Sequence, residues 1–258
     1  MEKAGIGVEE DFRWRGGDVS RIEGLSDAVF AFSVTLLVVS LEVPRTFNDL
    51  ITAMQGFVAF TLTFALLLWV WYNHYLFFRR YGLQDKLTIV LNAVLLFVVL
   101  FYIYPLKFLA TLVVDSIFGR KLVVTGPRGE MIPTIELSQT GTLMMVYGAG
   151  FMLVFLCFAL LYLHAYRKAT DLDLNEVEQF DTVTEIRSHS IIAGIGLISF
   201  IMALLVGSGN QVLSSLPYWF IGPAMWIHGR LRGKKRNRPV LHQNGGHRQK
   251  NHEDFKEG

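Results

Sequence analysis

The sequence predicts an all-α, polytopic membrane protein with six transmembrane helices per subunit. Three observations lead to this prediction. Of the 258 residues, 52% are hydrophobic, 20 of them Phe, and they gather in long runs. Polar breaks divide these runs into six stretches whose lengths approach or exceed the roughly 20 residues that a helix needs to cross a bilayer. Charged residues make up only 18% of the chain and mostly cluster between the stretches.

The six expected spans differ in length. The second and third exceed the minimum, so we expect them to tilt or to project beyond the bilayer. The fifth and sixth are short, and residues 207–211 between them are typical of a tight hairpin loop; a soluble or re-entrant hairpin is the alternative for this pair. The spans are 25–43, 51–78, 87–114, 140–164, 190–206 and 212–228.

The distribution of Lys and Arg predicts the orientation. Cytoplasmic segments of membrane proteins carry an excess of these residues, and here they gather before the first span, in the second and fourth connections and after the last span. We therefore expect a plasma-membrane protein with both termini in the cytoplasm. Residues 1–24 would be a cytoplasmic segment, 25–228 the transmembrane domain and 229–258 a basic, disordered tail. This tail could bind anionic lipid headgroups or act only as a topology anchor.

Polar residues recur at one depth near the expected inner face. Hydrocarbon cannot satisfy buried polar groups, so such residues can bond one another. We expect Asp27 and Ser26 to bond partners within their own subunit, with Arg21 a turn further out. The alternative is that these are ordinary interfacial residues that reach water. The expected partners are Trp71, His74 and Asn92.

The first span has an apolar stripe on another face. Residues three or four positions apart lie on the same side of a helix. This spacing places Phe32, Leu36, Val39 and Val43 together, with Thr35 beside them. Asp27 lies about 140° round the helix from Phe32, at 100° per residue. Several copies of such a helix could line a pore with hydrophobic rings, which gate ions by dewetting. The alternative is that the stripe faces lipid or packs against another helix.

The start of the first span resembles a family signature. The pattern R-x-x-x-F-S-D followed by A-x-x-x-T-L-L is typical of the transmembrane protein 175 family of potassium channels. The chain departs from it at Leu25, where the family has Phe. A Trp followed by a His late in the second helix is also similar to the family, here Trp71 and His74. The matching residues of the first span are Arg21, Ser26, Asp27, Ala31, Thr35, Leu36 and Leu37.

The resemblance implies a function. Members conduct K⁺ passively without a TVGYG-type filter, and the bacterial type, with one six-helix repeat, forms a homotetramer whose first helices line a central pore. It implies a main hydrophobic constriction at Phe32, further rings at Leu36 and Val39, and a Thr35 hydroxyl that touches passing ions. Phe32 is larger than the family's usual Ile or Leu, so four phenyl rings could block the pore, swing aside or face a cation.

Other functions have less support in the sequence. A secondary transporter of inverted repeats and a non-conducting protein of the same fold are the alternatives. We find no Ser/His/Asp constellation, HExxH motif or nucleotide loop, so we expect no enzyme, cofactor or resident metal, and K⁺ only as the permeant ion. A single Cys excludes a disulfide framework, and a net charge of +2 gives no argument for nucleic acid.

Overall fold

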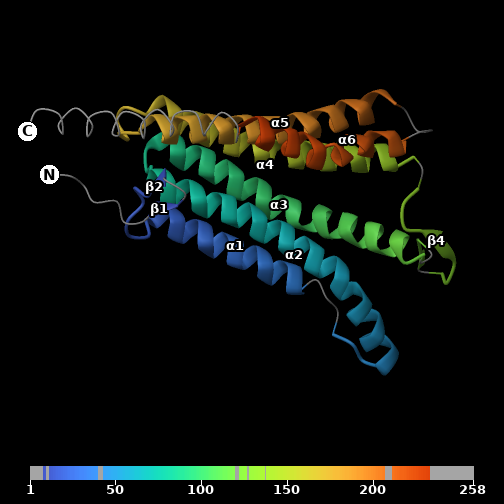
Figure 1. Ribbon diagram of the computed structural model, residues 1–258. Coiled ribbons are helices and arrows are strands. Elements are labelled where there is room, and N and C mark those ends of the chain that lie inside the picture. Colours follow the sequence, from blue (N-terminus) through green and yellow to red (C-terminus); the bar gives the residue numbers. More distant parts are fainter. Residues whose placement is uncertain are drawn as a thin grey trace, which may run out of the picture.

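The computed structural model describes residues 8–9, 12–39, 43–119, 122–126, 128–136, 138–206 and 211–232. Five helices in this part of the chain are long and apolar enough to cross a membrane. Figure 1 shows them nearly parallel, with α1, α2 and α3 in one group and α4 and α5 beside it. They are α1 (Arg21–Val39), α2 (Phe47–Tyr81), α3 (Lys86–Ile117), α4 (Thr140–Arg167) and α5 (Glu176–Leu205).

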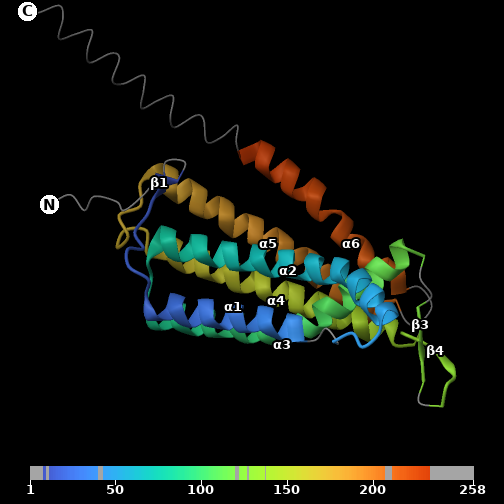
Figure 2. The same ribbon diagram turned by 90° about the horizontal axis from the view of Figure 1, so that it is seen from below.

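The remaining elements are short. Strands β1 (Val8–Glu9) and β2 (Phe12–Arg13) form an antiparallel pair before α1. Strands β3 (Val123–Thr125) and β4 (Met131–Pro133) form an antiparallel hairpin within the long connection between α3 and α4. Figure 2 shows this hairpin at the end of the bundle opposite the N-terminal strands.

Capping residues define where the long helices begin and end. Thr46 and Asp49 form a capping box at the start of α2, and Asn175 and Glu178 form another at the start of α5. Gly82 follows α2 with a φ of 60°, a conformation that ends helices and that glycine adopts without steric cost. Each box satisfies backbone N–H groups that have no partner inside the helix.

The helix that contains the expected fifth span is longer than the span itself. Helix α5 begins at Glu176, whereas the expected span begins at residue 190. The apolar run begins later than the helix because the first turns of α5 are polar. The capping box and contacts with the N-terminal segment stabilise these turns instead of lipid.

The sixth span also differs from the continuous helix expected over 212–228. The segment is a 3₁₀ helix, η2 (Gln211–Ser215), then α6 (Leu216–Trp219) and, after Phe220, helical residues 221–232. Pro217 lies at the start of α6, and proline lacks the N–H that would extend the preceding turn into an α-helix. Residues 207–210 of the expected hairpin loop, and 233–258 of the expected disordered tail, lie outside the described residues.

Two glycines allow α4 and α5 to pack closely. A Cβ on Gly148 would lie 2.9 Å from the backbone nitrogen of Phe200, and one on Gly196 would lie 2.9 Å from that of Met152. Small residues permit such backbone approach between membrane helices. Helices α4 and α5 therefore form a closely packed pair within the bundle.

Candidate functional site

Helix α1 has one buried and one exposed face. Its buried residues are Ser26, Phe30, Ser33 and Leu37. Phe32 is 54% exposed and Val39 is 73% exposed, Thr35 is exposed and Leu36 is half-buried. In a single subunit the predicted stripe is therefore largely uncovered.

A chain of hydrogen bonds joins the buried face of α1 to α3 and α2. The Asn92 side-chain amide of α3 donates to Ser26 Oγ over 2.9 Å, and the Ser26 hydroxyl donates to the Ile22 carbonyl over 2.8 Å. His74 Nε2 of α2 lies 2.9 Å from Asn92 Oδ1. Because that oxygen accepts, the network assigns the proton to His74 Nε2. Ser26, His74 and Asn92 are at most 2% exposed, and each polar group in the chain of bonds has a partner.

Asp27 makes a second contact between α1 and α2. Trp71 Nε1 donates to Asp27 Oδ1 over 2.9 Å. Asp27 and Phe32 flank the buried face of α1 on opposite sides, about 140° apart at 100° per residue. The structure thus brings Ser26 and Asp27 onto Asn92, His74 and Trp71 within one subunit, while Arg21 is the exposed first residue of α1.

Thr35 points away from the rest of the subunit. It lies nine residues after the buried Ser26, which at 100° per residue places it about 180° round the helix. Its hydroxyl donates to the Ala31 carbonyl over 3.0 Å. Since the proton is used within the helix, the lone pairs of the oxygen remain available on the exposed face.

A segment that was not predicted from the sequence fixes the start of α1. Residues 12–17, here called the N-terminal strap, reach Glu178 in the first turn of α5. Arg15 Nη2 and Nη1 donate to the two carboxylate oxygens of Glu178 over 2.6 and 3.0 Å, and the Arg13 backbone N–H donates over 2.9 Å. The Glu178 side chain is fully buried, and that of Arg15 is 14% exposed. This pair lies 163 positions apart, so no local sequence signal reveals it.

The strap also bonds the end of α2. The backbone N–H groups of Arg15 and Gly16 both donate to the Arg79 carbonyl, over 3.1 and 3.0 Å, and Arg79 Nη1 donates to the Gly17 carbonyl over 2.7 Å. A Cβ on Gly16 would lie 2.5 Å from the Phe78 carbonyl oxygen. Only glycine permits this approach, and Gly16-Gly17 before a helix is the one signal in the sequence that could have revealed it.

A further ion cluster joins α3 to α4 at the same end of the bundle. Asp85, the N-cap of α3, lies 2.7 Å from His164 Nε2 and 3.2 Å from Lys168 Nζ. Burial alone would raise the pKa of Asp85, but hydrogen bonds from Thr88, His164 and Lys168 outweigh it and hold the pKa well below its usual range. Asp85 is therefore a carboxylate at neutral pH.

These features define a class of protein: a multi-pass α-helical membrane protein whose first helix is fixed on one side and uncovered on an apolar side. The chain belongs to the TMEM175 family. The family model, described as "Endosomal/lysosomal potassium channel TMEM175", matches residues 21–102, which contain both the motif of α1 and its partners on α2 and α3. Among the described residues no group of three or more His, Cys, Asp or Glu side chains could hold a metal ion.

Three comparisons define the similarity. A potassium channel from Marivirga tractuosa is 40% identical over 236 residues, which cover 90% of this chain and 95% of that protein. A potassium channel from Chamaesiphon minutus is 33% identical over 101 residues, 36% of this chain and 50% of that one. The crystal structure of a variant of the potassium channel MtTMEM175, in complex with a nanobody-MBP fusion, matches with a TM-score of 0.74 at 40% identity, covering 89% of this chain and 100% of that one.

Proposed function

We propose that this chain is the subunit of a passive, K⁺-favouring cation channel. Four copies surround an axis, α1 of each copy lines the pore, and both termini lie in the cytoplasm at the plasma membrane. The observation that carries the proposal is the exposed apolar face of α1, where Phe32 is 54% and Val39 is 73% exposed, while polar contacts fix the opposite side. A helix held in this way presents the same face in every subunit, away from that subunit's own bundle and toward the proposed axis.

Assembly from several copies follows from the single motif. Residues 21–37 contain the motif once, so a pore enclosed on all sides by α1 needs more than one chain. The 40% identical relative carries the name potassium channel. This similarity supports K⁺ as the permeant ion, and the single-repeat type of the family supports a tetramer.

The gate we propose is a ring of four Phe32 side chains, followed by rings of Leu36 and Val39. Successive rings lie roughly 4.5–6 Å apart, at 1.5 Å per residue. An ion entering so apolar a neck loses hydration that the side chains do not replace, so the neck resists conduction when narrow. Thr35 offers the nearest oxygen lone pairs, and its position supports a role in ion selectivity.

The polar contacts position this face. We assign Ser26, Asp27, Trp71, His74 and Asn92 to rotation of α1 and not to ion binding, because their hydrogen bonds lie within one subunit, on the sides of α1 away from Phe32. Anionic headgroups are the expected partners of the basic residues after α6. The channel itself needs no cofactor, nucleic acid or enzymatic step.

The test is ion flux through the reconstituted full-length chain. Liposomes loaded with K⁺ and diluted into Na⁺ should develop an inside-negative potential, recorded by a voltage-sensitive dye, without an added ionophore. Empty liposomes are the control, and valinomycin gives the maximal response. A membrane potential that develops with a K⁺ gradient, but hardly at all with a Na⁺ gradient, supports the proposal.

Phe32 favours one competing function, a non-conducting protein of the same fold, because phenyl rings are bulkier than the residues the family usually has at this position. If wild type and Phe32→Ala are both silent in liposomes that respond to valinomycin, this alternative is correct. A flux that saturates at low K⁺ and does not follow the membrane potential would instead indicate a secondary transporter.

A further inference from the structure

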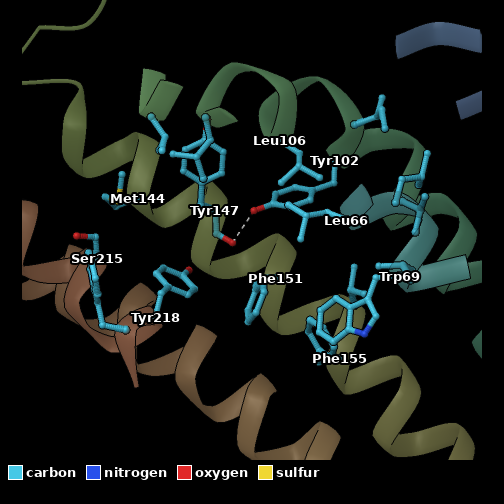
Figure 3. A pocket seen from close by; sticks show the side chains of 18 residues that line it. Leu66, Trp69, Tyr102, Leu106, Met144, Tyr147, Phe151, Phe155, Ser215 and Tyr218 are labelled. Carbon is cyan, nitrogen blue, oxygen red and sulfur yellow. Dashed lines mark hydrogen bonds between the residues drawn. The ribbon is translucent and has the colours of Figure 1, made fainter. Parts of the chain in front are cut away.

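A cavity of about 410 Å³ lies between α2, α3, α4 and the broken sixth segment. Figure 3 shows it enclosed by aromatic and aliphatic side chains from these four elements, among them Trp69, Tyr102, Tyr147, Phe155 and Tyr218. This volume is within the range of small-molecule binding sites. The motif of α1 does not contribute to its wall.

Two tyrosine hydroxyls on the wall are already bonded. Tyr102 of α3 donates to the Tyr147 carbonyl over 2.9 Å, and Tyr147 of α4 donates to the Pro105 carbonyl over 2.8 Å. The Tyr102 ring packs against Gly150, where a Cβ would lie 2.2 Å from Tyr102 Cε2. These contacts hold α3 against α4 and fix the wall, so the cavity is a built feature. They also leave little polar surface for water.

The sixth segment explains why the space is unfilled. A straight α-helix opposite α4 would place side chains along the whole cavity. The 3₁₀ turn of η2, Pro217 and the short α6 instead leave only Ser215, Tyr218 and Trp219 on this wall. Protein interiors are close-packed and contain few voids larger than a water molecule, so a cavity of this size has room for a ligand.

The cavity lies at membrane depth and opens at the surface. Leu109 is eight residues from the end of α3 and Tyr147 seven from the start of α4, which corresponds to about 12 and 10 Å along the helices. Three lining residues are exposed: Trp69 at 42%, Val113 at 40% and Trp219 at 79%. Trp is enriched at membrane–water interfaces, so Trp219 places the mouth near the headgroups of the leaflet opposite the N-terminal strap.

We propose that this cavity binds one acyl chain of a phospholipid from that leaflet. Water needs two to four polar partners to occupy a cavity, whereas apolar cavities take apolar ligands. At this depth, the chains of surrounding phospholipids are the apolar groups at the highest concentration. The headgroup stays at the interface beside Trp219, and the chain passes Val113 to reach Phe155 and Trp69. The site requires only that the helices span a bilayer, not that the protein conducts K⁺.

Brominated lipid tests the proposal, because bromine on an acyl chain quenches Trp fluorescence on contact. The full-length protein is reconstituted in phosphatidylcholine dibrominated near mid-chain or in the unbrominated lipid, then re-extracted into lipid-free detergent. Two of the five Trp residues line the cavity. We expect wild type to keep a quenched signal, with one brominated lipid per subunit by mass spectrometry, and Trp69→Phe/Trp219→Phe to lose that quenching while retaining the lipid.

Cavity-blocking variants complete the test. Val113→Phe narrows the mouth and Val154→Phe fills the interior; both should lose most of the retained lipid. Val94→Phe is the matched control, since Val94 is also on α3, is 44% exposed and does not line the cavity. The proposal is wrong if wild type retains no brominated lipid, if both blocking variants retain as much as Val94→Phe, or if the double Trp variant stays quenched. K⁺ flux of the same preparations, measured separately, reports on the channel proposal alone.

Discussion

Replacing Glu178 with Gln removes the charge that holds the N-terminal strap. The Glu178 carboxylate accepts four hydrogen bonds, two from Arg15, one from the Arg13 backbone and one from the Asn175 backbone, at 2.6 to 3.0 Å. A Gln side chain keeps the shape of Glu, but an amide nitrogen replaces one of the two carboxylate oxygens. This nitrogen cannot accept hydrogen bonds from the N–H donors that face it. Arg15, only 14% exposed, then lacks its counter-charge.

The expected loss of stability follows from these contacts. Removing one partner of a buried ion pair costs about 3–5 kcal/mol, and the residual exposure of Arg15 places this pair near the lower end, at about 3 kcal/mol. For a chain of this size each kcal/mol shifts the thermal midpoint by about 2–4 °C, so Glu178→Gln should lower it by about 6–12 °C. The measurement is the fraction of assembled protein left on size-exclusion chromatography after heating in detergent.

Glu176→Gln is the matched control for this experiment. It makes the same change of charge in the same turn of α5, but Glu176 is exposed, and exposed substitutions usually stay within about 0.5 kcal/mol. If the two variants melt together within about 2 °C, the strap contributes little, and the position of α1 depends on the bundle contacts alone.

Four further predictions concern the hydrogen bonds, the gate, the topology and pH. Asn92→Ala should remove the acceptor of His74 Nε2 and the donor to Ser26 Oγ, while the Ser26 hydroxyl keeps its bond to the Ile22 carbonyl. The buried His74 N–H left without an acceptor costs about 1–3 kcal/mol, so the assembled fraction in detergent should fall; Asn73→Ala, whose amide bonds the Trp69 carbonyl of its own helix, should not reduce it. Phe32→Ala should raise cation flux and weaken K⁺ preference. Val38→Ala is the control, because Val38 is 48% exposed and Phe32 is 54% exposed. Equal flux through the two variants would show that Phe32 does not line the pore. In a chain lacking Cys157, an impermeant thiol reagent outside the cell should label Ser208→Cys but not Ser20→Cys. Labelling of Ser20→Cys would indicate the opposite topology. Because the pKa of Asp85 is lowered in the folded protein, its stabilising contribution is complete above the unfolded pKa of about 3.9 and declines as the pH falls below that value. The thermal midpoints of wild type and Asp85→Asn should therefore differ at pH 7 and approach each other in acid. A difference that stays constant with pH would contradict the assignment.

The parts of the fold that depend on lipid were predictable from the sequence. Hydrocarbon forces backbone groups into helices and polar side chains onto one another, so long apolar runs predicted the cores of α1 to α4. Depth alone suggested that Ser26, Asp27, Trp71, His74 and Asn92 meet, and their hydrogen bonds are present. Whether Phe32, Thr35, Leu36 and Val39 line a pore stays a prediction, because a single subunit shows only that this face is uncovered.

The parts that depend on water and on long-range contacts were not predictable in this way. The polar start of α5 is stabilised by a cap and by the strap, neither of which raises hydropathy. The Arg15–Glu178 pair joins segments 163 positions apart, and nothing in the spacing of either residue indicates the other. The sixth segment has the composition of a span, and hydropathy alone does not indicate that it begins as a 3₁₀ helix and is interrupted at Phe220.

The contacts of α1 are unevenly distributed along its length, and this has a consequence for gating. Among the described residues, side-chain hydrogen bonds from α1 to other helices are made by Ser26 and Asp27 in its first two turns. Beyond Phe30 the described polar side chains bond only within the helix, Ser33 to the Val29 carbonyl and Thr35 to the Ala31 carbonyl. The later turns are therefore held by apolar packing, which is non-directional and resists small rotations less than hydrogen bonds do. The proposed rings at Phe32, Leu36 and Val39 all lie on this freer part. Substitutions at Ser26 or Asp27 should thus act on assembly, whereas substitutions after Phe30 should act on flux with the assembly intact. A variant such as Leu36→Ala that dissociates the proposed tetramer as readily as Asp27→Ala would contradict this division.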